Sequence, residues 1–371
     1  MKGKAALSLL PFLLSGCAVE SPEYRSFVEI GEDGIRIIQL ADCHWGMYSD
    51  LSREKAYLSA LIDFSDADMV ILTGDQVLLA DKKTYRELLD TLEESDLSHF
   101  ALAWGNHDEQ GLYPFSYPTD LALSYPKCLN KDNPGDDVFG ASNFVIDLTY
   151  LGKRVHSLYV LDSNKLSPSG LSLPYDVIHQ DQIDWYAEMV EEQQREDGYR
   201  VPQSLFFHIG LWQYEYAYRL RGQLGEYSDD PSCPGTLFDY SGDMGEESWE
   251  VPGLGETRVY CGYEDSGLFD KASELGAKAM FVGHDHKNDF CALYSASRDP
   301  DEAIALCYGL KSGEGCTYLE GHLGANIIDI NSRGEIIGLN RLYLDYEDDN
   351  DYSGASYRFE PIFQSLVSEG E

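Results

Sequence analysis

Two histidines separated by one residue could place two metal ligands side by side. His284 and His286 follow the apolar run 277–282 after a single glycine. In an extended segment, residues two apart face the same side of the backbone, so both imidazole rings can reach one site. Imidazole nitrogens are common ligands of transition metals. The spacing therefore predicts that one short turn serves two neighbouring metal ions.

Four apolar runs upstream also end in residues that could bind a metal. The possible ligands are Asp42 and His44 after 35–41, Asp75 after 69–73, Asn106, His107 and Asp108 after 100–104, and His208 after 204–207. The order strand, motif, helix, strand is typical of parallel sheets, which bind ligands at the carboxyl ends of their strands. Packing alone does not explain five strand ends with possible ligands. The pattern predicts one shared site.

The five blocks, D-x-H, G-D, G-N-H-D, H and G-H-x-H in this order, resemble the calcineurin-type binuclear metallophosphoesterases. The resemblance spans residues 33–343. Residues 161–163, 182–185, 283–291 and 307–309 resemble the subgroup of fungal dose-dependent cell-cycle-regulator phosphatases and their bacterial relatives, near the purple acid phosphatases. The resemblance implies a four-layer fold of the α/β or α+β class. In it, two mixed β-sheets pack as a sandwich flanked by helices.

The resemblance also implies how two metal ions would be held. One ion would be bound by Asp42, His44, Asp75 and His286, and the second by Asp75, Asn106, His208 and His284. Asp75 would then bridge the two ions. Imidazole and carboxylate ligands without thiolates suit manganese, zinc or iron, and they argue against a structural zinc site. The two divalent ions would outweigh the two carboxylates and leave a positive centre that attracts a phosphate oxygen.

The mechanism that the resemblance implies is in-line attack on phosphorus by a metal-bound hydroxide. His107 would sit beside the phosphate and donate a proton to the leaving group, with Asp108 as its orienting partner. Asp285 would face away from the two histidines and act at most through other residues.

Two positions depart from related patterns. Leu78 stands where purple acid phosphatases place a tyrosine ligand of iron, so a fixed iron(III) is not implied. Tyr308 and Lys311 lie in a segment that the subgroup uses near its site, but Leu310 stands where a basic residue is expected. A phosphate-binding role for this segment is therefore left open.

The first residues have the pattern of a bacterial lipoprotein signal. Lys2 and Lys4 precede an apolar stretch, and small residues at 15 and 16 precede Cys17. The pattern predicts removal of residues 1–16 and lipid attachment at Cys17, which would anchor an exported protein to the cell-envelope membrane. An ordinary signal peptide with an incidental cysteine is the alternative. The expected organisation is a signal peptide at 1–16, a tether at 17–32, a metallophosphoesterase domain at 33–345 and an acidic tail at 346–371.

The formal net charge is −38, and it becomes −40 when Lys2 and Lys4 leave with the signal peptide. Such a surface repels phosphate backbones, which disfavours nucleic-acid binding and an exported nuclease. The leading prediction is a cell-envelope enzyme that hydrolyses phosphate monoesters or diesters. The alternative is a surface lipoprotein that binds a phosphorylated ligand without turnover. No feature of the sequence indicates an oligomeric state.

Six cysteines besides Cys17 and Cys43 could form disulfides in an exported chain. We expect Cys43 to be free and prefer Cys291 with Cys307, because these two flank a short excursion between two expected strands. Cys233 with Cys261 is a second possible pair. Residues 109–140 are expected to be a loop that forms one wall of the site. Residues 211–263 are expected to be either a lid or a solvated insertion.

Overall fold

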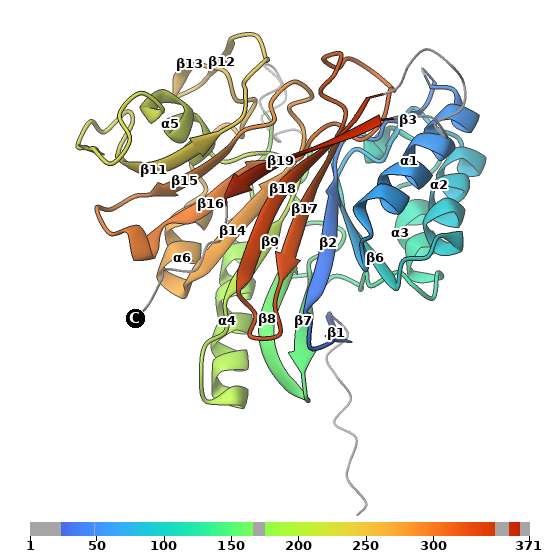
Figure 1. The fold of residues 1–371 in the computed structure, drawn as a ribbon, viewed down its shortest axis with the longest axis horizontal. Coiled ribbons are helices and arrows are strands. Elements are labelled where there is room, and N and C mark those ends of the chain that lie inside the picture. The colour runs from blue at the N-terminus through green and yellow to red at the C-terminus, as the bar shows by residue number, and fades with distance from the viewer. Residues whose placement is uncertain (1–23, 48, 166–174, 346–355, 364–371) are drawn as a thin grey trace, which may run out of the picture.

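The computed structural model describes residues 24–47, 49–165, 175–345 and 356–363 (Figure 1). The signal peptide and the lipidation site expected at Cys17 lie outside these residues. Two large β-sheets face each other in the centre, and helices cover both outer faces. The expected four-layer sandwich is therefore confirmed.

The six-stranded sheet delivers three of the five blocks. Its strands lie in the order β19-β18-β17-β2-β4-β6, in which β2, β4 and β6 are parallel. β4 is buried throughout, because the second sheet covers one face and helices cover the other. This explains its uninterrupted apolar sequence. The bounds are β2 Ile35–Leu40, β4 Met69–Thr73, β6 His99–Ala103, β17 Gly324–Ile330, β18 Ile336–Asp345, β19 Ser356–Phe363, α1 Leu51–Ser65, α2 Lys82–Glu94 and α3 Ser116–Leu123.

The nine-stranded sheet delivers the other two blocks, from its parallel strands β9 and β14. Its strands lie in the order β1-β7-β8-β9-β14-β16-β15-β11-β10, and α4, α5 and α6 lie on its outer side (Figure 1). The bounds are β1 Arg25–Glu29, β7 Phe144–Tyr150, β8 Lys153–Val160, β9 Gln203–Phe206, β10 Tyr227–Ser228, β11 Gly235–Ser241, β14 Ala277–Val282, β15 Cys291–Ser295, β16 Ile304–Tyr308, α4 Gln180–Asp197, α5 Trp212–Leu220 and α6 Leu268–Leu275.

Two small ribbons and two short helices complete the described elements. β3 (Trp45–Gly46) pairs with β5 (Val77–Leu78), and β12 (Trp249–Val251) pairs with β13 (Gly255–Thr257). The short 3-10 helices are η1 (Asp108–Gln110) and η2 (Pro300–Glu302). In the part of the chain that the structure describes, no helix is long and apolar enough to cross a membrane.

Three apolar clusters fill the spaces between the four layers. Phe206 and Phe281 stack between the two sheets, with ring centroids 4.9 Å apart. Leu61 and Leu88 belong to the cluster beneath α1 and α2, and Phe269 belongs to the cluster beneath α6. Each fully buried side chain of this size contributes about 1.5–3 kcal/mol of transfer free energy. The strand ends are thus fixed by a packed core on both sides.

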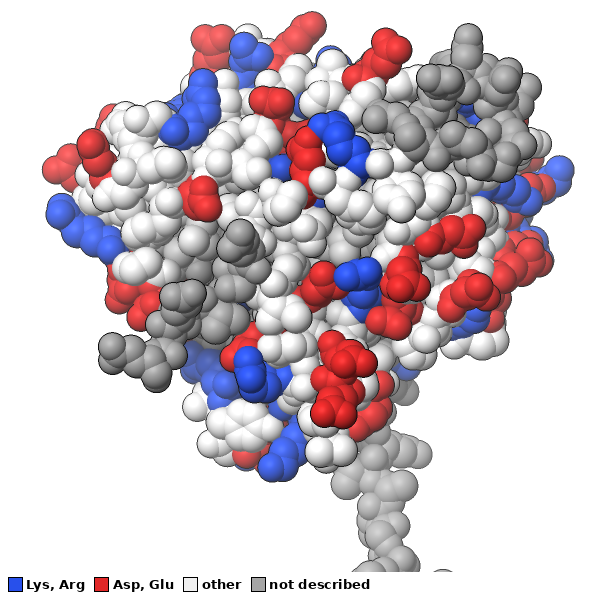
Figure 2. Space-filling view, in the orientation of Figure 1, with Lys and Arg blue, Asp and Glu red and all other residues white. Residues whose placement is uncertain are grey.

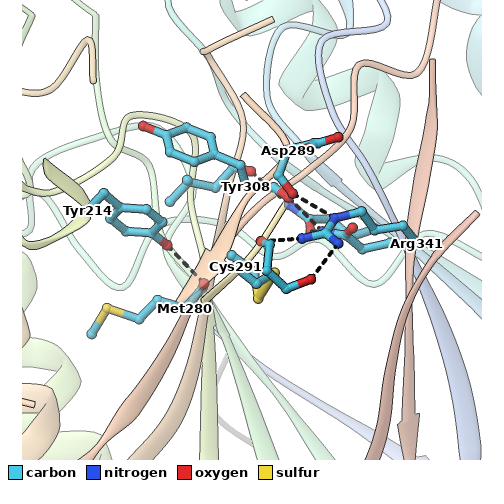
Figure 3. The surroundings of a disulfide bond; sticks show 11 residues. Tyr214, Met280, Asp289, Cys291, Tyr308 and Arg341 are labelled. Carbon is cyan, nitrogen blue, oxygen red and sulfur yellow. Dashed lines mark hydrogen bonds between the residues drawn. A yellow bond between two sulfur atoms is a disulfide. The ribbon is translucent and has the colours of Figure 1, made fainter. Parts of the chain in front are cut away.

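A disulfide joins Cys291 and Cys307, which lie opposite each other on the antiparallel strands β15 and β16. This confirms the preferred pairing. Cys233 and Cys261 are free, so the second pairing was wrong, and Cys43 is free as expected. Beside the disulfide, Arg341 of β18 donates to the carbonyl oxygens of Asp289 and Ser241, each at 2.7 Å (Figure 3). These bonds join the two sheets.

Several expected boundaries differ from the structure. β1 lies inside the expected tether and pairs with β7, and β19 lies inside the expected acidic tail and pairs with β18. Both sheets therefore extend past the limits of the predicted domain. The expected loop at 109–140 contains α3, and residues 211–263 contain α5 and β10–β13. Elements this short do not repeat often enough to show a hydrophobic period in the sequence.

Candidate metal centre

The predicted ligands meet at one end of the sandwich, although they come from both sheets. Asp42, His44, Asp75 and His286 offer ligand atoms that all lie within 4.8 Å of one another. Asp75, His208 and His284 form a second group by the same measure. Asp75 belongs to both groups, which is the arrangement that a bridging carboxylate requires. The first group has the members of the first expected set, and the second group contains three of the four residues expected for the second ion.

The backbone at these strand ends adopts unusual conformations. The φ angles of Asp42, His44, Asp75 and His284 are 53°, 52°, 52° and 78°. Each left-handed non-glycine residue costs about 1–3 kcal/mol, so the surrounding structure must impose it. Here Asp42 Oδ2 accepts a hydrogen bond from the backbone N–H of His284 at 2.9 Å. Four of the nine left-handed non-glycine residues in the described part of the chain are therefore predicted ligands.

Close packing around Asp75 also requires a glycine. A Cβ atom at Gly105 would lie 2.3 Å from Oδ1 of Asp75. That oxygen accepts the backbone N–H of His107 at 2.8 Å. Gly105 thus lets the Asn106–His107 turn approach the Asp75 carboxylate.

The first ligand group is tightly clustered. Nε2 of His44 lies 3.0 Å from Nε2 of His286 and 3.6 Å from Oδ2 of Asp75. Oδ1 of Asp42 lies 3.5 Å from Nε2 of His286. Nδ1 of His286 faces the carbonyl oxygen of Thr317 at 2.9 Å, which turns Nε2 toward the other ligands.

The second group is organised around His208. Its Nε2 lies 3.3 Å from Oδ2 of Asp75 and 3.1 Å from Oδ1 of Asn106. Its Nδ1 faces the carbonyl oxygen of Thr73 at 2.8 Å. Asn106 thus lies where its amide oxygen can serve as the neutral ligand expected from the sequence.

Three buried atoms at the centre test whether metal ions fit. Among the residues that the structure describes, Oδ1 of Asp42, Oδ2 of Asp75 and Nε2 of His284 have no hydrogen-bond partner. An unsatisfied buried polar group costs about 1–3 kcal/mol. Three such atoms in one ligand cluster therefore indicate that a shared partner binds there. Divalent cations satisfy carboxylate oxygens and imidazole nitrogens together. The residues present therefore fit a pair of metal ions.

Burial and neighbouring charges separate the pKa values of the histidines. Burial lowers the pKa of His44 to about 3 and holds that of His284 well below its usual range, so both rings are neutral at pH 7. Burial alone would also lower the pKa of His208, but the Asp75 carboxylate outweighs it and raises this pKa to about 10. Metal binding must therefore displace a proton from His208.

A cavity of about 320 Å³ opens onto the ligands. Asp75, His284 and His286 form its floor together with His107. The other lining residues are Tyr175, Glu246, Glu247, Tyr260, Lys287 and Thr317. Glu246, Glu247 and Tyr260 come from residues 211–263, which the sequence left open as a lid or an insertion. No described lining residue of this cavity comes from 109–140, so the expectation that this segment forms one wall of the site was wrong.

Residues 35–288 match the model of the family described as calcineurin-like phosphoesterase. The chain belongs to this family. Family membership confirms the resemblance found in the sequence and makes this chain a phosphoester hydrolase. The two ligand groups are compatible with the binuclear metal centre expected for such a phosphoesterase.

Curated relatives and a solved structure agree with this assignment. The phosphoesterase is 24% identical over 346 residues to probable inactive purple acid phosphatase 14 of Arabidopsis thaliana, covering 83% of this chain and 78% of that protein. It is 26% identical over 307 residues to phosphatase DCR2 of Saccharomyces cerevisiae, covering 76% of this chain and 48% of that protein. A dimetal phosphatase from Danio rerio shares the fold, with a TM-score of 0.50, 11% identity and coverage of 84% and 96% of the two chains.

The structure gives His107 a different partner from the one expected. His107 is partly exposed, and its Nε2 lies 3.9 Å from Oδ2 of Asp75. Its Nδ1 faces Oε1 of Gln110 at 2.8 Å, one turn along η1, so Asp108 does not orient it. The signal for Gln110 was its position three residues after His107, which brings the two side chains together only in a helical turn.

Asp108 instead supports the backbone beneath the centre. Its carboxylate accepts N–H groups of Gly105 at 2.8 Å, Asp75 at 3.0 Å and Val77 at 3.3 Å. Burial raises the pKa of Asp108 well above its usual range, and the nearby Asp75 carboxylate adds to this. The expectation that Asp108 orients the catalytic histidine was therefore wrong, because three backbone donors occupy its oxygens.

Lys311 and Asp285 lie behind the ligands. Nζ of Lys311 is buried and donates to the carbonyl oxygen of Asp42 at 2.5 Å, so this lysine supports the first block from behind. It does not line the cavity. Asp285 accepts hydrogen bonds from the backbone of Tyr260 and the side chain of Asn288, at 3.3 and 2.9 Å. It thereby fixes the turn that carries His284 and His286.

Proposed function

We propose that this phosphoesterase hydrolyses phosphate monoesters or diesters at a centre of two divalent ions, either manganese, zinc or iron. The observation that carries the proposal is the set of three buried atoms, on Asp42, Asp75 and His284, that have no hydrogen-bond partner among the described residues. Two of these residues, Asp75 and His284, line an open cavity. When bound, the ions would supply an activated water for in-line attack and positive charge for the phosphoryl oxygens.

His107 has the geometry of a proton donor to the leaving group. Gln110 engages Nδ1, and Nε2 is turned toward the bridging carboxylate and the cavity. A protonated imidazole in this position can transfer its Nε2 proton to the departing alkoxide. Asn106, on the same turn, keeps its amide oxygen near His208. The turn that follows β6 thus combines a metal ligand with a catalytic group.

A purified protein comprising residues 18–371 tests the proposal with manganese or zinc. Its activity should be measured on p-nitrophenyl phosphate and bis-p-nitrophenyl phosphate, beside Asp75→Asn and the exposed control Asp137→Asn. Metal-dependent turnover that Asp75→Asn abolishes and the control retains would establish the activity. The ratio of the two rates would separate monoesterase from diesterase.

The second candidate is a protein that binds a phosphorylated ligand without turnover. The Arabidopsis relative is called a probable inactive phosphatase, which keeps this candidate in view. Two bound metal ions without turnover on either ester would favour the binding role. A protein that binds no metal would contradict both candidates.

We also propose that the protein is exported and anchored to the cell envelope through lipid on Cys17. Seven residues, 18–24, separate Cys17 from β1 at Arg25, so the chain between them spans at most about 25 Å. β1 lies at the opposite end of the sandwich from β3 and the β12–β13 hairpin (Figure 1). Such an anchor would hold the cavity away from the membrane. Incorporation of labelled palmitate into the native chain, and its loss in Cys17→Ser, would test the anchor.

The surface charge suits a soluble domain held at a membrane surface. Figure 2 shows acidic side chains spread over one face, with lysine and arginine between them and no continuous basic area on its described part. This agrees with the formal net charge of −38. It supports a small-molecule or protein substrate over a nucleic acid.

A further inference from the structure

One wall of the cavity is aromatic. Tyr175 and Tyr260 line it, and the ring of Tyr175 stands edge-to-face with that of His284 at 4.2 Å between centroids. The ring centroid of Trp249 lies 6.3 Å from that of Tyr175 and 5.5 Å from that of Tyr260, and the Trp249 residue is 39% exposed. Three aromatic rings therefore lie together beside a metal ligand.

Backbone hydrogen bonds hold this wall in a defined position. The N–H of Tyr263 donates to the carbonyl oxygen of Tyr175 at 3.1 Å. The N–H of Tyr260 donates to Oδ2 of Asp285, in the turn between the two histidine ligands, at 3.3 Å. The aromatic wall is thus fixed directly to the turn that positions His284 and His286.

Two carboxylates accompany the rings. Glu246 accepts the backbone N–H of Lys287 at 3.0 Å, and Lys287 Nζ lies 3.6 Å from its other oxygen. The guanidinium of Arg258 is engaged with the Glu246 carbonyl oxygen. Glu247 also lines the cavity and is exposed, and among the residues that the structure describes its carboxylate has no partner. Lys287 and Arg258 of this wall thus interact with Glu246, whereas the Glu247 carboxylate is left to interact with a ligand.

The combination of aromatic rings and carboxylates indicates the kind of group that the wall can bind. Aromatic faces and carboxylates together attract organic cations, and aromatic cages bind quaternary ammonium groups. The same carboxylates repel a second phosphate group, which disfavours nucleoside polyphosphates even though aromatic rings can stack on a base. The metal ligands lie on the floor of the same cavity, so a phosphate there places its alcohol group beside the wall.

We propose that the substrates are zwitterionic phosphate esters whose alcohol carries an ammonium group. This inference rests on the proposed function and specifies its substrate class. The phosphate would lie over the ligands Asp75, His284 and His286, and the cation against Tyr175, Tyr260 and Glu247. Cation–π contact and a free carboxylate together correspond to a preference of about 5- to 30-fold over an uncharged alcohol of the same shape.

The test compares phosphocholine with 3,3-dimethylbutyl phosphate, in which a neutral carbon replaces the ammonium nitrogen. If the enzyme is a diesterase, the p-nitrophenyl diesters of the same two alcohols make the same comparison. The wild-type protein with manganese should show at least a ~5-fold higher kcat/KM for the cationic ester. Tyr260→Leu and Glu247→Gln should each reduce this ratio at least about threefold.

Two control variants make the result specific. Tyr260→Phe keeps an aromatic face and should keep the preference. Glu250→Gln removes an exposed carboxylate of β12 that does not line the cavity, and it should change the hydrolysis of neither ester. Equal kcat/KM for the two esters in the wild type overturns the inference, as does a full preference retained by Tyr260→Leu or Glu247→Gln.

Failure of the proposed function gives a different result. Without hydrolysis of p-nitrophenyl phosphate, its diester or either choline-type ester, the enzymatic assignment and this inference fall together. Hydrolysis of the nitrophenyl esters without preference for the cation overturns only the substrate class.

Discussion

His284 donates its backbone N–H to Oδ2 of Asp42 at 2.9 Å, across a sequence separation of 242 residues. This bond joins the ends of β14 and β2, which belong to different sheets. It also divides the Asp42 carboxylate between two tasks, because Oδ2 holds the turn while Oδ1 remains unpartnered among the ligands. The Asp42 carboxylate therefore links the two sheets with one oxygen and faces the other ligands with the second.

This division predicts different effects for two substitutions of Asp42. Asp42→Asn keeps an acceptor for the His284 N–H but loses the negative charge, so the protein should fold and bind one metal ion per chain in place of two. Asp42→Ala should also leave the buried N–H unsatisfied, at a cost of about 1–3 kcal/mol. Metal content by elemental analysis and urea unfolding would measure the two effects. Two tightly bound metals in Asp42→Asn would contradict the ligand assignment.

A proton donor matters most when the leaving group is a poor one. His107→Ala should lower kcat on an alkyl phosphate by about 10²–10⁴-fold and have a much smaller effect on p-nitrophenyl phosphate, whose leaving group needs little protonation. Metal content should be unchanged, since His107 is not needed as a ligand. Steady-state kinetics on both esters would check this. Equal losses on the two esters would show that His107 acts in binding and not in proton transfer.

Asp108 and Gln110 should behave differently from each other. Asp108→Ala removes the acceptor of three backbone N–H groups, so we expect a loss of unfolding free energy of several kcal/mol, at about 1–3 kcal/mol for each unsatisfied group. Gln110→Ala should leave stability almost unchanged and reduce activity on alkyl phosphates, because His107 loses its orienting partner. Chemical denaturation and kinetics on both variants separate the roles. A stable Asp108→Ala variant with the kinetic defect would restore Asp108 as the orienting residue.

The ligand-bearing strand ends could be predicted because each is marked by a contiguous apolar run followed directly by polar residues. β4 is buried at every position since both of its faces are covered, and Asp75 follows the strand after a single glycine. The partner of His107 could not be predicted in this way, because it depends on the 3-10 turn that brings Gln110 back. β1 and β19 were missed because each lies at the edge of its sheet and pairs with a single neighbour, β7 or β18, that is distant in the sequence or follows a stretch without a clear strand pattern.

The aromatic residues of the cavity wall could not be identified from the sequence for a related reason. Tyr175, Trp249 and Tyr260 come together through a two-stranded ribbon of three residues per strand and a set of long-range hydrogen bonds. Segments this short carry no periodic signal, and aromatic residues are common in ordinary cores. The wall can be recognised only in the folded structure, where Asp285 of the His284–His286 turn holds Tyr260 in position.

A buried histidine far from the metal centre predicts how stability depends on pH. His156 is fully buried between the carbonyl oxygen of Gly334 at 2.7 Å and the hydroxyl of Ser204 at 2.9 Å. Burial lowers its pKa to about 4, below the value of about 6.5 in an unfolded chain. The unfolded state therefore binds more protons between these values, and stability falls as the pH decreases from about 6.5 to about 4.

At pH 5 this histidine alone should cost about 2 kcal/mol of unfolding free energy relative to pH 7.5. His156→Gln keeps a polar side chain but cannot titrate, so its stability should decline less over the same range by about that amount. Urea unfolding of both proteins at the two pH values, in the same metal-containing buffer, gives the difference directly. Parallel pH profiles for the two proteins would show that His156 does not limit stability in acid.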